Sequence, residues 1–248
     1  MGFDYLRHAA SVSHHGIIDF SKTYLGLKNK WRIMLLKPVR WKTFPREFLR
    51  IQIGFFLFGL AITLMIRGNI GTSAWAVLEV ALASKLHISV GTMTVLMGFI
   101  VLSGALLMRE QLGWGTLANI LSIGPWEDFW LSIIPSVKDN LLLQSGMLLL
   151  AIFLMGLASA IYIGVDAGAG PRDSMMLAIK RTTGISIRVA RAIIEVTVVT
   201  LGWLLGGPAG LGTVIYALLV GPSVQFGFKI FNVHPHGPEA LSPQAPED

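Results

Sequence analysis

The chain has 248 residues, of which 53% are hydrophobic and only 14% charged, and its mean hydropathy is +0.65. This composition offers too little polar surface to cover a water-soluble globule of that size, so it excludes an ordinary soluble domain and predicts a protein of the lipid bilayer. The sequence contains no cysteine, which excludes disulfides and thiolate metal sites.

Residues 1–48 form a basic extension ahead of the first long apolar stretch. Ten of the 20 Lys and Arg residues fall within the first 50 positions, against three acids, so the positive-inside rule places this end in the cytoplasm. Residues 24–41 interleave apolar and basic side chains, which fits either an interfacial helix on anionic headgroups or a solvated lead-in that only fixes topology. Because membrane orientation explains the net charge of +6, no nucleic-acid partner is expected.

Six stretches with few or no charges follow, each close to the ~17–25 residues that a helix needs to cross ~30 Å of hydrocarbon. They cover residues 49–66, 92–108, 115–134, 141–163, 187–205 and 211–231. The apolar runs are continuous rather than alternating, which indicates helices and not barrel strands. The sequence therefore predicts an all-α, polytopic membrane helix bundle in the inner (plasma) membrane.

The bundle is predicted to consist of two tandem repeats, residues 49–134 and 141–231, at an offset of 97 positions. Gly59 falls on Gly156 (156 − 59 = 97), and the same register aligns further glycines, prolines and apolar residues. The aligned pairs include Phe56-Leu57 with Phe153-Leu154, Ile88-Ser89 with Ile185-Ser186, Gly115-Thr116 with Gly212-Thr213, and Gly124-Pro125 with Gly221-Pro222. Such duplication is frequent among secondary transporters. The last residues, 232–248, carry four prolines and read as a disordered tail.

One short segment in each repeat does not fit the span length. Residues 72–85 and 171–183 occupy corresponding places, follow glycine-bearing turns, and would extend only ~20 Å as helices. If they are re-entrant or broken helices, the chain has six long spans and inverted halves; if they cross, it has eight spans and parallel halves. Length favours six. Paired short helices of this kind point to a transporter binding site, and their N-termini suit an anionic group.

Several motifs in the second half resemble those of the bacterial YczE/YyaS/YitT-type membrane proteins. The segments are GAGPRD at 168–173, IRVARAIIE at 187–195, GWLLGG at 202–207 and GLGT at 210–213. In the first half, Asn119 and Gly124-Pro125 followed by Asp128-Phe129 are similar to the same pattern. The resemblance covers about residues 50–231. It implies a multi-pass inner-membrane protein and names no substrate.

Polar residues at membrane depth are the candidates for a site, because an ionised group near the bilayer centre costs roughly 2.5–3.5 kcal/mol and persists only if it is paired, solvated or useful. The predicted substrate-binding residues are Arg172, Asp173, Arg191 and Asn119, and the predicted ion-coupling residues are Glu195 and Asp128. Arg172 would bind an anion with its guanidinium fork. A carboxylate in a low-dielectric site would take up the coupling proton or cation.

Structural roles for these charges stay open. Arg191 and Glu195 stand at i, i+4 and can form a neutralising pair. Arg172 and Asp173 can cap the short helix, and Asp128 can sit at the membrane interface beside two tryptophans.

The function predicted from these features is a secondary transporter or permease for a small anionic or zwitterionic solute. An accessory or regulatory membrane subunit, docking through its basic extension, is the alternative. No nucleophile–base arrangement and no metal-ligand constellation can be assembled from the sequence, so no enzyme activity, metal or cofactor is expected. The expected partners are the bilayer, the solute, a proton or cation, and a second copy or a partner membrane subunit.

Overall fold

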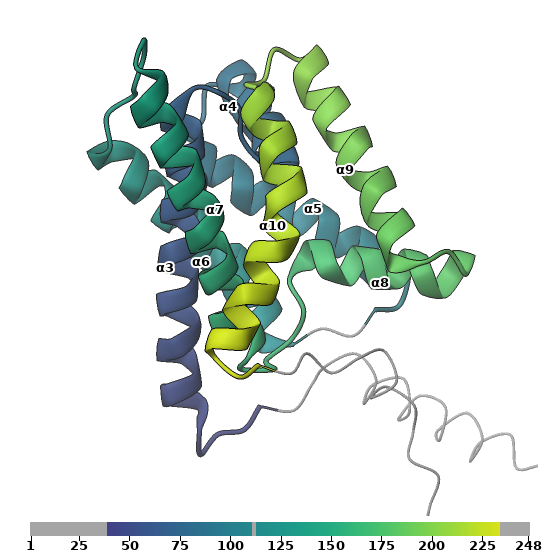
Figure 1. The fold of residues 1–248 in the computed structure, drawn as a ribbon. Helices are drawn as coiled ribbons and strands as arrows, with labels where there is room; N and C mark the ends of the chain where they lie inside the picture. Colours follow the sequence, from purple (N-terminus) through teal and green to yellow (C-terminus); the bar gives the residue numbers. More distant parts are fainter. Residues whose placement is uncertain (1–38, 111–112, 234–248) are drawn as a thin grey trace, which may run out of the picture. The chain divides into compact units, whose positions relative to one another are not determined.

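The computed structural model describes residues 39–110 and 113–233, and their regular secondary structure is helical throughout. Eight helices lie within these residues: α3 (Phe44–Gly68), α4 (Ala74–Leu86), α5 (Val90–Leu107), α6 (Trp114–Ile133), α7 (Leu141–Ile163), α8 (Pro171–Thr183), α9 (Ile187–Leu204) and α10 (Leu211–Ile230) (Figure 1). The all-α prediction is confirmed. The predictions for residues 1–38 and for 234–248 lie outside the described residues.

Four of the described helices are long and apolar enough to cross a membrane, namely α3, α5, α7 and α10. α6 and α9 have 20 and 18 residues but carry charged side chains within their length, and the six-span count therefore stays a prediction. The short helices α4 and α8 have 13 residues each, close to the lengths expected from the sequence. α3 begins at Phe44, ahead of the boundary predicted at 49, with Pro45 in its first turn where a missing N–H is harmless.

The helices of the second half begin 97 residues after those of the first, as the pairs 44 and 141, 74 and 171, 90 and 187, and 114 and 211 show. α3 and α7 pack antiparallel, because Gly54 lies against Ala158 near one end of the contact and Gly68 lies against Gln144 near the other. Their facing sides form the centre of the largest core cluster, which includes Phe55.

Helix contacts recur in reciprocal form across the two halves. α3 packs against α6 and α7 packs against α10, with glycine at the same relative place: a Cβ at Gly59 would lie 2.8 Å from the backbone nitrogen of Glu127, and one at Gly156 would overlap Ser223. α4 likewise packs against α9, and α8 against α5. Each short helix therefore lies against a helix of the other half.

The loops that precede the short helices are tied down across the halves by backbone hydrogen bonds. The N–H of Gly212 donates to the carbonyl of Ile70 (2.7 Å), and the N–H of Gly115 donates to the carbonyl of Ala167 (3.0 Å). Both donors belong to the first turn of a helix, where N–H groups have no partner within the helix. These bonds fix the places at which α4 and α8 begin.

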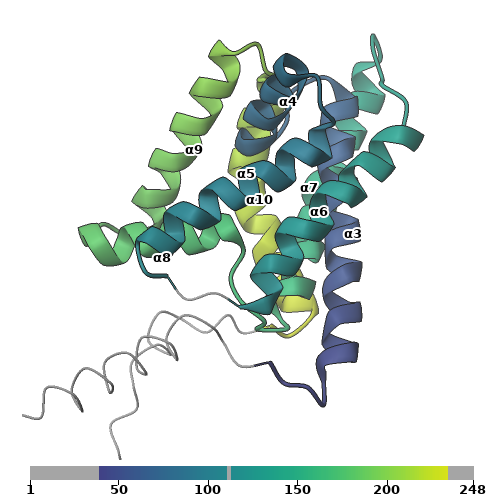
Figure 2. The ribbon, with the colours of Figure 1, turned by 180° about the vertical axis from the view of Figure 1, so that it is seen from behind.

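One pair of contacts breaks the reciprocity. α5 packs against α6, with Gly91 and Gly124 so close that a methyl group on either would overlap the other's backbone. The corresponding helices, α9 and α10, do not pack on each other in this way, and nothing lies within 4 Å of the Cβ position of Gly221. Figures 1 and 2 show α9 and α10 diverging from the loop that joins them. We call the contact between α5 and α6 the α5–α6 seam, and the corresponding region between α9 and α10, where the helices do not pack closely, the α9–α10 seam.

Candidate functional site

A cavity of ≈ 410 Å³ lies where the two halves meet, and all eight described helices contribute to its wall. Much of the wall is apolar or aromatic, including Phe58, Tyr162 and Tyr216. The polar lining contains five of the six residues predicted from the sequence: Asn119, Arg172, Asp173, Arg191 and Glu195. An apolar chamber with a few charged groups is the usual form of a small-molecule site.

Both short helices begin at this cavity. Ser73, the N-cap of α4, and Gly170, the N-cap of α8, belong to its wall together with the first residues of each helix. The Ser73 side chain accepts a hydrogen bond from the N–H of Ala76, whereas Gly170 has no side chain with which to cap α8. Helix N-termini carry partial positive charge and free N–H donors. Two of them at one cavity favour a negatively charged ligand group.

Arg172 crosses the interior from α8 to α4. Its guanidinium bonds Glu79 (Nη2–Oε1 2.5 Å) and lies over the ring of Trp75, 4.7 Å from the centroid. The Glu79 side chain is fully buried, while that of Arg172 is 29% exposed and faces the cavity. The guanidinium thus reaches the cavity and at the same time neutralises Glu79, an acid that solvent does not reach.

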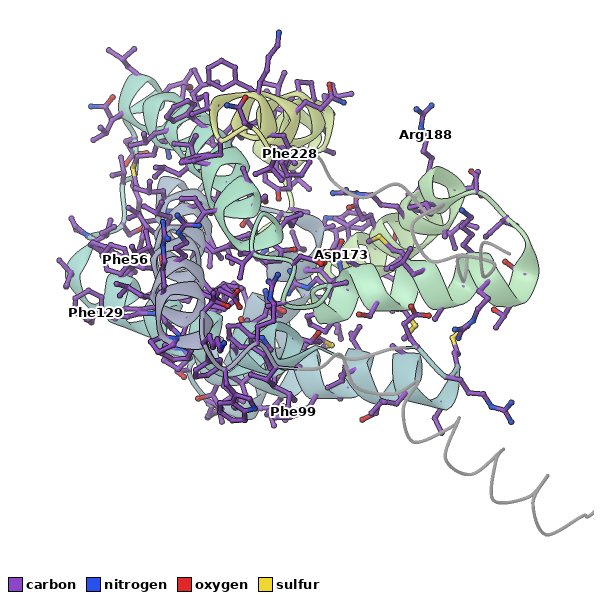
Figure 3. The ribbon with its side chains drawn as sticks, turned by 90° about the horizontal axis from the view of Figure 1, so that it is seen from below. Phe56, Phe99, Phe129, Asp173, Arg188 and Phe228 are labelled. Carbon is purple, nitrogen blue, oxygen red and sulfur yellow. The ribbon has the colours of Figure 1, made fainter. Side chains whose placement is uncertain are left out.

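Asp173 lies toward the middle of the molecule at the start of α8, as Figure 3 shows. Its carboxylate accepts a hydrogen bond from the hydroxyl of Tyr162 on α7 (3.0 Å). This contact joins the first turn of α8 to the cavity wall, in place of the helix-capping role considered from the sequence.

A second ion pair lies at the α9–α10 seam. Arg191 donates from Nε to Oε1 of Glu195 at 2.8 Å, which is the i, i+4 pair considered as the structural alternative. Both side chains also line the cavity, and they are 47% and 29% exposed. Arg188, one turn before Arg191, points away from the molecule (Figure 3). A pair that is solvated and faces the cavity can exchange its partners for those of a ligand at lower cost than a fully buried pair.

Asp128 does not line the cavity. Its carboxylate accepts hydrogen bonds from the Ser89 hydroxyl (2.5 Å) and the Gly91 N–H (2.8 Å), so it caps the first turn of α5 and holds the α5–α6 seam together. The sequence analysis predicted Asp128 as an ion-coupling residue of the site, and the structure places it outside the cavity wall. One residue along a helix turns the side chain by about 100°, which points Asp128 to the seam and Glu127 to the interior.

Among the described residues, Glu79 and Glu127 are the two fully buried acids, and the sequence interpretation left both out of the site. Both are 0% exposed, and each keeps one carboxylate oxygen without a hydrogen-bond partner. Glu127 accepts a hydrogen bond from Thr94 (2.8 Å), and Thr94 lines the cavity. The available signal was that Glu79 is the sole acid of a 13-residue apolar helix. Within the described residues, no group of three His, Cys, Asp or Glu side chains is placed to hold a metal ion.

These features define a helical membrane protein with a cavity whose wall carries charged side chains. Residues 45–229 match the model of DUF6198, a family of unknown function, and the chain belongs to this family. An uncharacterized protein of Haemophilus influenzae is 32% identical over 211 residues, which cover 85% of this chain and 94% of that relative. No solved structure matches the chain.

Two relatives from Bacillus subtilis carry names. The uncharacterized membrane protein YczE is 30% identical over 178 residues, covering 70% of this chain and 81% of YczE. The uncharacterized protein YyaS is 29% identical over 194 residues, covering 76% and 95%. The resemblance to YczE and YyaS inferred from the sequence motifs is confirmed.

The Arg172–Glu79 pair gives a direct test of the interior charge balance. Arg172→Gln leaves Glu79 buried without its cation and should destabilise the protein by roughly 3–5 kcal/mol, whereas adding Glu79→Gln should restore most of that loss. Apparent melting temperatures of the two single variants and the double variant, in one detergent, measure the coupling. Additive losses would show that the two side chains do not interact.

Proposed function

We propose that this protein is a secondary transporter in the inner (plasma) membrane, with a cytoplasmic N-terminus, for a small solute that carries a carboxylate or similar anionic group, either alone or as a zwitterion. The observation that supports this most strongly is the cavity itself. It combines two helix N-termini with the cavity-facing guanidinium of Arg172, and it lies between halves whose helices repeat at a constant offset. Discontinuous short helices that begin at a central site are characteristic of secondary transporters.

In this proposal Arg172 binds the anionic group of the solute. Its planar fork can form two parallel hydrogen bonds to a carboxylate, and the N-terminus of α8 adds favourable charge at the same place. A cationic group on the solute would find Asp173 and Glu195, whose carboxylates face the same cavity. Asn119 supplies a neutral hydrogen-bonding side chain on the wall. The aromatic lining suits the apolar part of the solute.

The two halves are, in this proposal, inverted repeats related by a pseudo-two-fold axis. The antiparallel packing of α3 on α7 and the reciprocal bonds of Gly212 with Ile70 and of Gly115 with Ala167 support it, because a two-fold relation pairs i with j and j with i. α4 and α8 then dip into the membrane without crossing it. Six spans result.

The seams are then the two gates of alternating access. One gate, the α5–α6 seam, is closed by glycine contact and the Asp128 cap, while the α9–α10 seam is open beside the Arg191–Glu195 pair. In inverted-repeat transporters the two halves exchange conformations to open the site to the other side. The opposite state of this protein therefore has α9 closed on α10 and α5 parted from α6.

Single-cysteine labelling tests the topology, and the absence of native cysteine makes it direct. Cysteine at His87, after α4, and at Thr183, at the end of α8, should be reached from opposite sides of the membrane if there are six spans. With eight spans both positions would label from the same side. Because the comparison is relative, it does not depend on which way the protein is inserted.

Paired cysteines test the gates. Ser89→Cys with Asp128→Cys spans the closed seam, where the native side chains are 2.5 Å apart, and Ser186→Cys with Gln225→Cys is its counterpart 97 residues on. A short bifunctional thiol reagent should link the first pair rapidly and the second slowly, as α9 closes in the minor state. The single-cysteine variants are the controls. Complete linkage of the first pair with none of the second after long exposure would indicate a fixed bundle, as an accessory subunit would have.

Ligand binding tests the substrate class. We expect at least one compound from a panel of amino acids and small carboxylic acids to raise the melting temperature of the purified protein. At a ligand concentration 100-fold above Kd, binding adds about 2.7 kcal/mol to the free energy of unfolding. Arg172→Lys keeps the charge but loses the fork, so it should fold and lose most of that shift. Arg188→Gln, an arginine outside the cavity, is the matched control. An equal rise in melting temperature in Arg172→Lys would show that Arg172 does not bind the ligand. A panel in which no compound raises the melting temperature would contradict the substrate class.

A further inference from the structure

Glu127 stands out in the interior because it is completely buried and no cation within residues 39–110 and 113–233 contacts it. Oε2 accepts a hydrogen bond from the Thr94 hydroxyl at 2.8 Å, and Oε1 has no hydrogen-bond partner. The side chain is 0% exposed. An ionised carboxylate in this position would lack both water and a counter-charge, which costs several kcal/mol.

The groups around Glu127 do not supply a free positive charge. α3 contributes the Thr63 hydroxyl, which donates to the Glu127 backbone carbonyl, and α5 contributes Thr94. The charged groups whose fields reach Glu127 are Glu79 of α4, Arg172 of α8 and Asp128 of its own helix.

Of these groups, Arg172 is bonded to Glu79, and the Asp128 carboxylate is occupied by Ser89 and Gly91. Glu79 and Glu127 thus share a single guanidinium. If both acids were ionised, the buried group would carry one uncompensated negative charge.

We propose that Glu127 holds a proton, and that Glu79 and Glu127 together form the proton site of the transport cycle, with solute binding linked to it through Arg172. This rests on the proposed function for the link to solute, and on the buried geometry alone for the proton. With Arg172 bonded to Glu79, the acid pair carries one proton, on Glu127. The charges of Arg172, Glu79 and Glu127 are then balanced.

Solute binding changes that balance. An anionic group that takes the guanidinium of Arg172 leaves Glu79 without its cation, so a second proton must pass from cavity water to a Glu79 carboxylate oxygen. One negative charge and one proton enter together, and the net charge of the interior does not change. Thr94 is placed for proton access, because its hydroxyl contacts Glu127 and its side chain lines the cavity. The chemistry is that of a proton-coupled symporter for an anion.

This assignment replaces the two coupling carboxylates predicted from the sequence. Glu195 is bonded to Arg191 and is 29% exposed, so a cation and solvent both compensate its charge. Asp128 accepts a backbone N–H and a hydroxyl at the start of α5, so its carboxylate already has a structural role in the α5–α6 seam. Glu127 is 0% exposed, and no cation of the described residues contacts it.

Infrared difference spectroscopy of the purified protein, without any solute, tests the inference. Wild type should show the carbonyl absorption of a protonated carboxylic acid at neutral pH, shifted in D2O, and Glu127→Gln should abolish it. Asp128→Asn and Glu195→Gln are matched controls that should leave it unchanged. Arg172→Gln should add a second such band, which Glu79→Gln in the same chain should remove. Absence of the band in wild type, or its survival in Glu127→Gln, overturns the proposal.

A second variant provides a spectroscopic readout if Glu127→Gln folds poorly. Thr94→Val keeps the acid and removes its hydrogen-bond donor, so the infrared band should shift without disappearing.

Stability provides an independent readout. Folding takes up a proton that the unfolded chain releases at neutral pH, so the apparent melting temperature of wild type should fall as pH rises. Stabilisation by sodium chloride but not by choline chloride, without a carboxylic acid band, would show a sodium site and overturn the proton assignment.

These measurements keep the two proposals apart. A band that depends on Glu127 in a protein that binds no compound of the panel would support the proton site and contradict the transporter. A solute that binds through Arg172 in a protein whose acids are all ionised would contradict the proton site alone.

Discussion

The arrangement of the interior depends on two backbone hydrogen bonds that cross between the halves, from Gly212 to Ile70 and from Gly115 to Ala167. A short helix that begins inside a bundle exposes N–H groups that no preceding turn satisfies. The crossing bonds hold the loop before each short helix against the other half, and so fix where α4 and α8 begin. Without them neither the Arg172–Glu79 pair nor the chamber between the short helices would have a defined geometry.

Charge balance is the second constraint, because it decides which polar residues can be buried together. Arg172 neutralises Glu79 in the interior, Arg191 neutralises Glu195 at the open seam, and Asp128 is stabilised by hydrogen bonds at a helix start. Each arrangement lowers the cost of desolvation by a different route. Glu127 has one hydrogen bond, from Thr94, and no contacting cation among the described residues. It is the residue at which the interior departs from the rule that buried charges are paired, and such departures are commonly functional.

Composition and periodicity were enough to predict the helices and the two short segments, because apolar run length reports directly on whether a helix can be buried in lipid. Five of the six residues predicted for the site line the cavity, and four of these five are charged side chains, which are rare in apolar surroundings. The sequence could not show that Asp128 faces the α5–α6 seam while Glu127 faces the interior, because the two are adjacent and only the rotation of α6 against α5 distinguishes them. The pairing of Arg172 with Glu79, 93 residues away, depends on tertiary packing that local sequence does not encode.

The difference between the two seams has a further consequence for how a duplicated protein can diverge. Gly91 and Gly124 allow α5 and α6 to touch, whereas the position corresponding to Gly91 is Arg188, whose side chain points away from the bundle. Each seam is thus specified by its own half of the sequence. A substitution in one half changes the packing free energy of one seam and leaves the other unaltered, so the difference between the seams is set by the positions at which the two halves carry different residues. Single substitutions can therefore adjust that difference without changing the chamber between the halves.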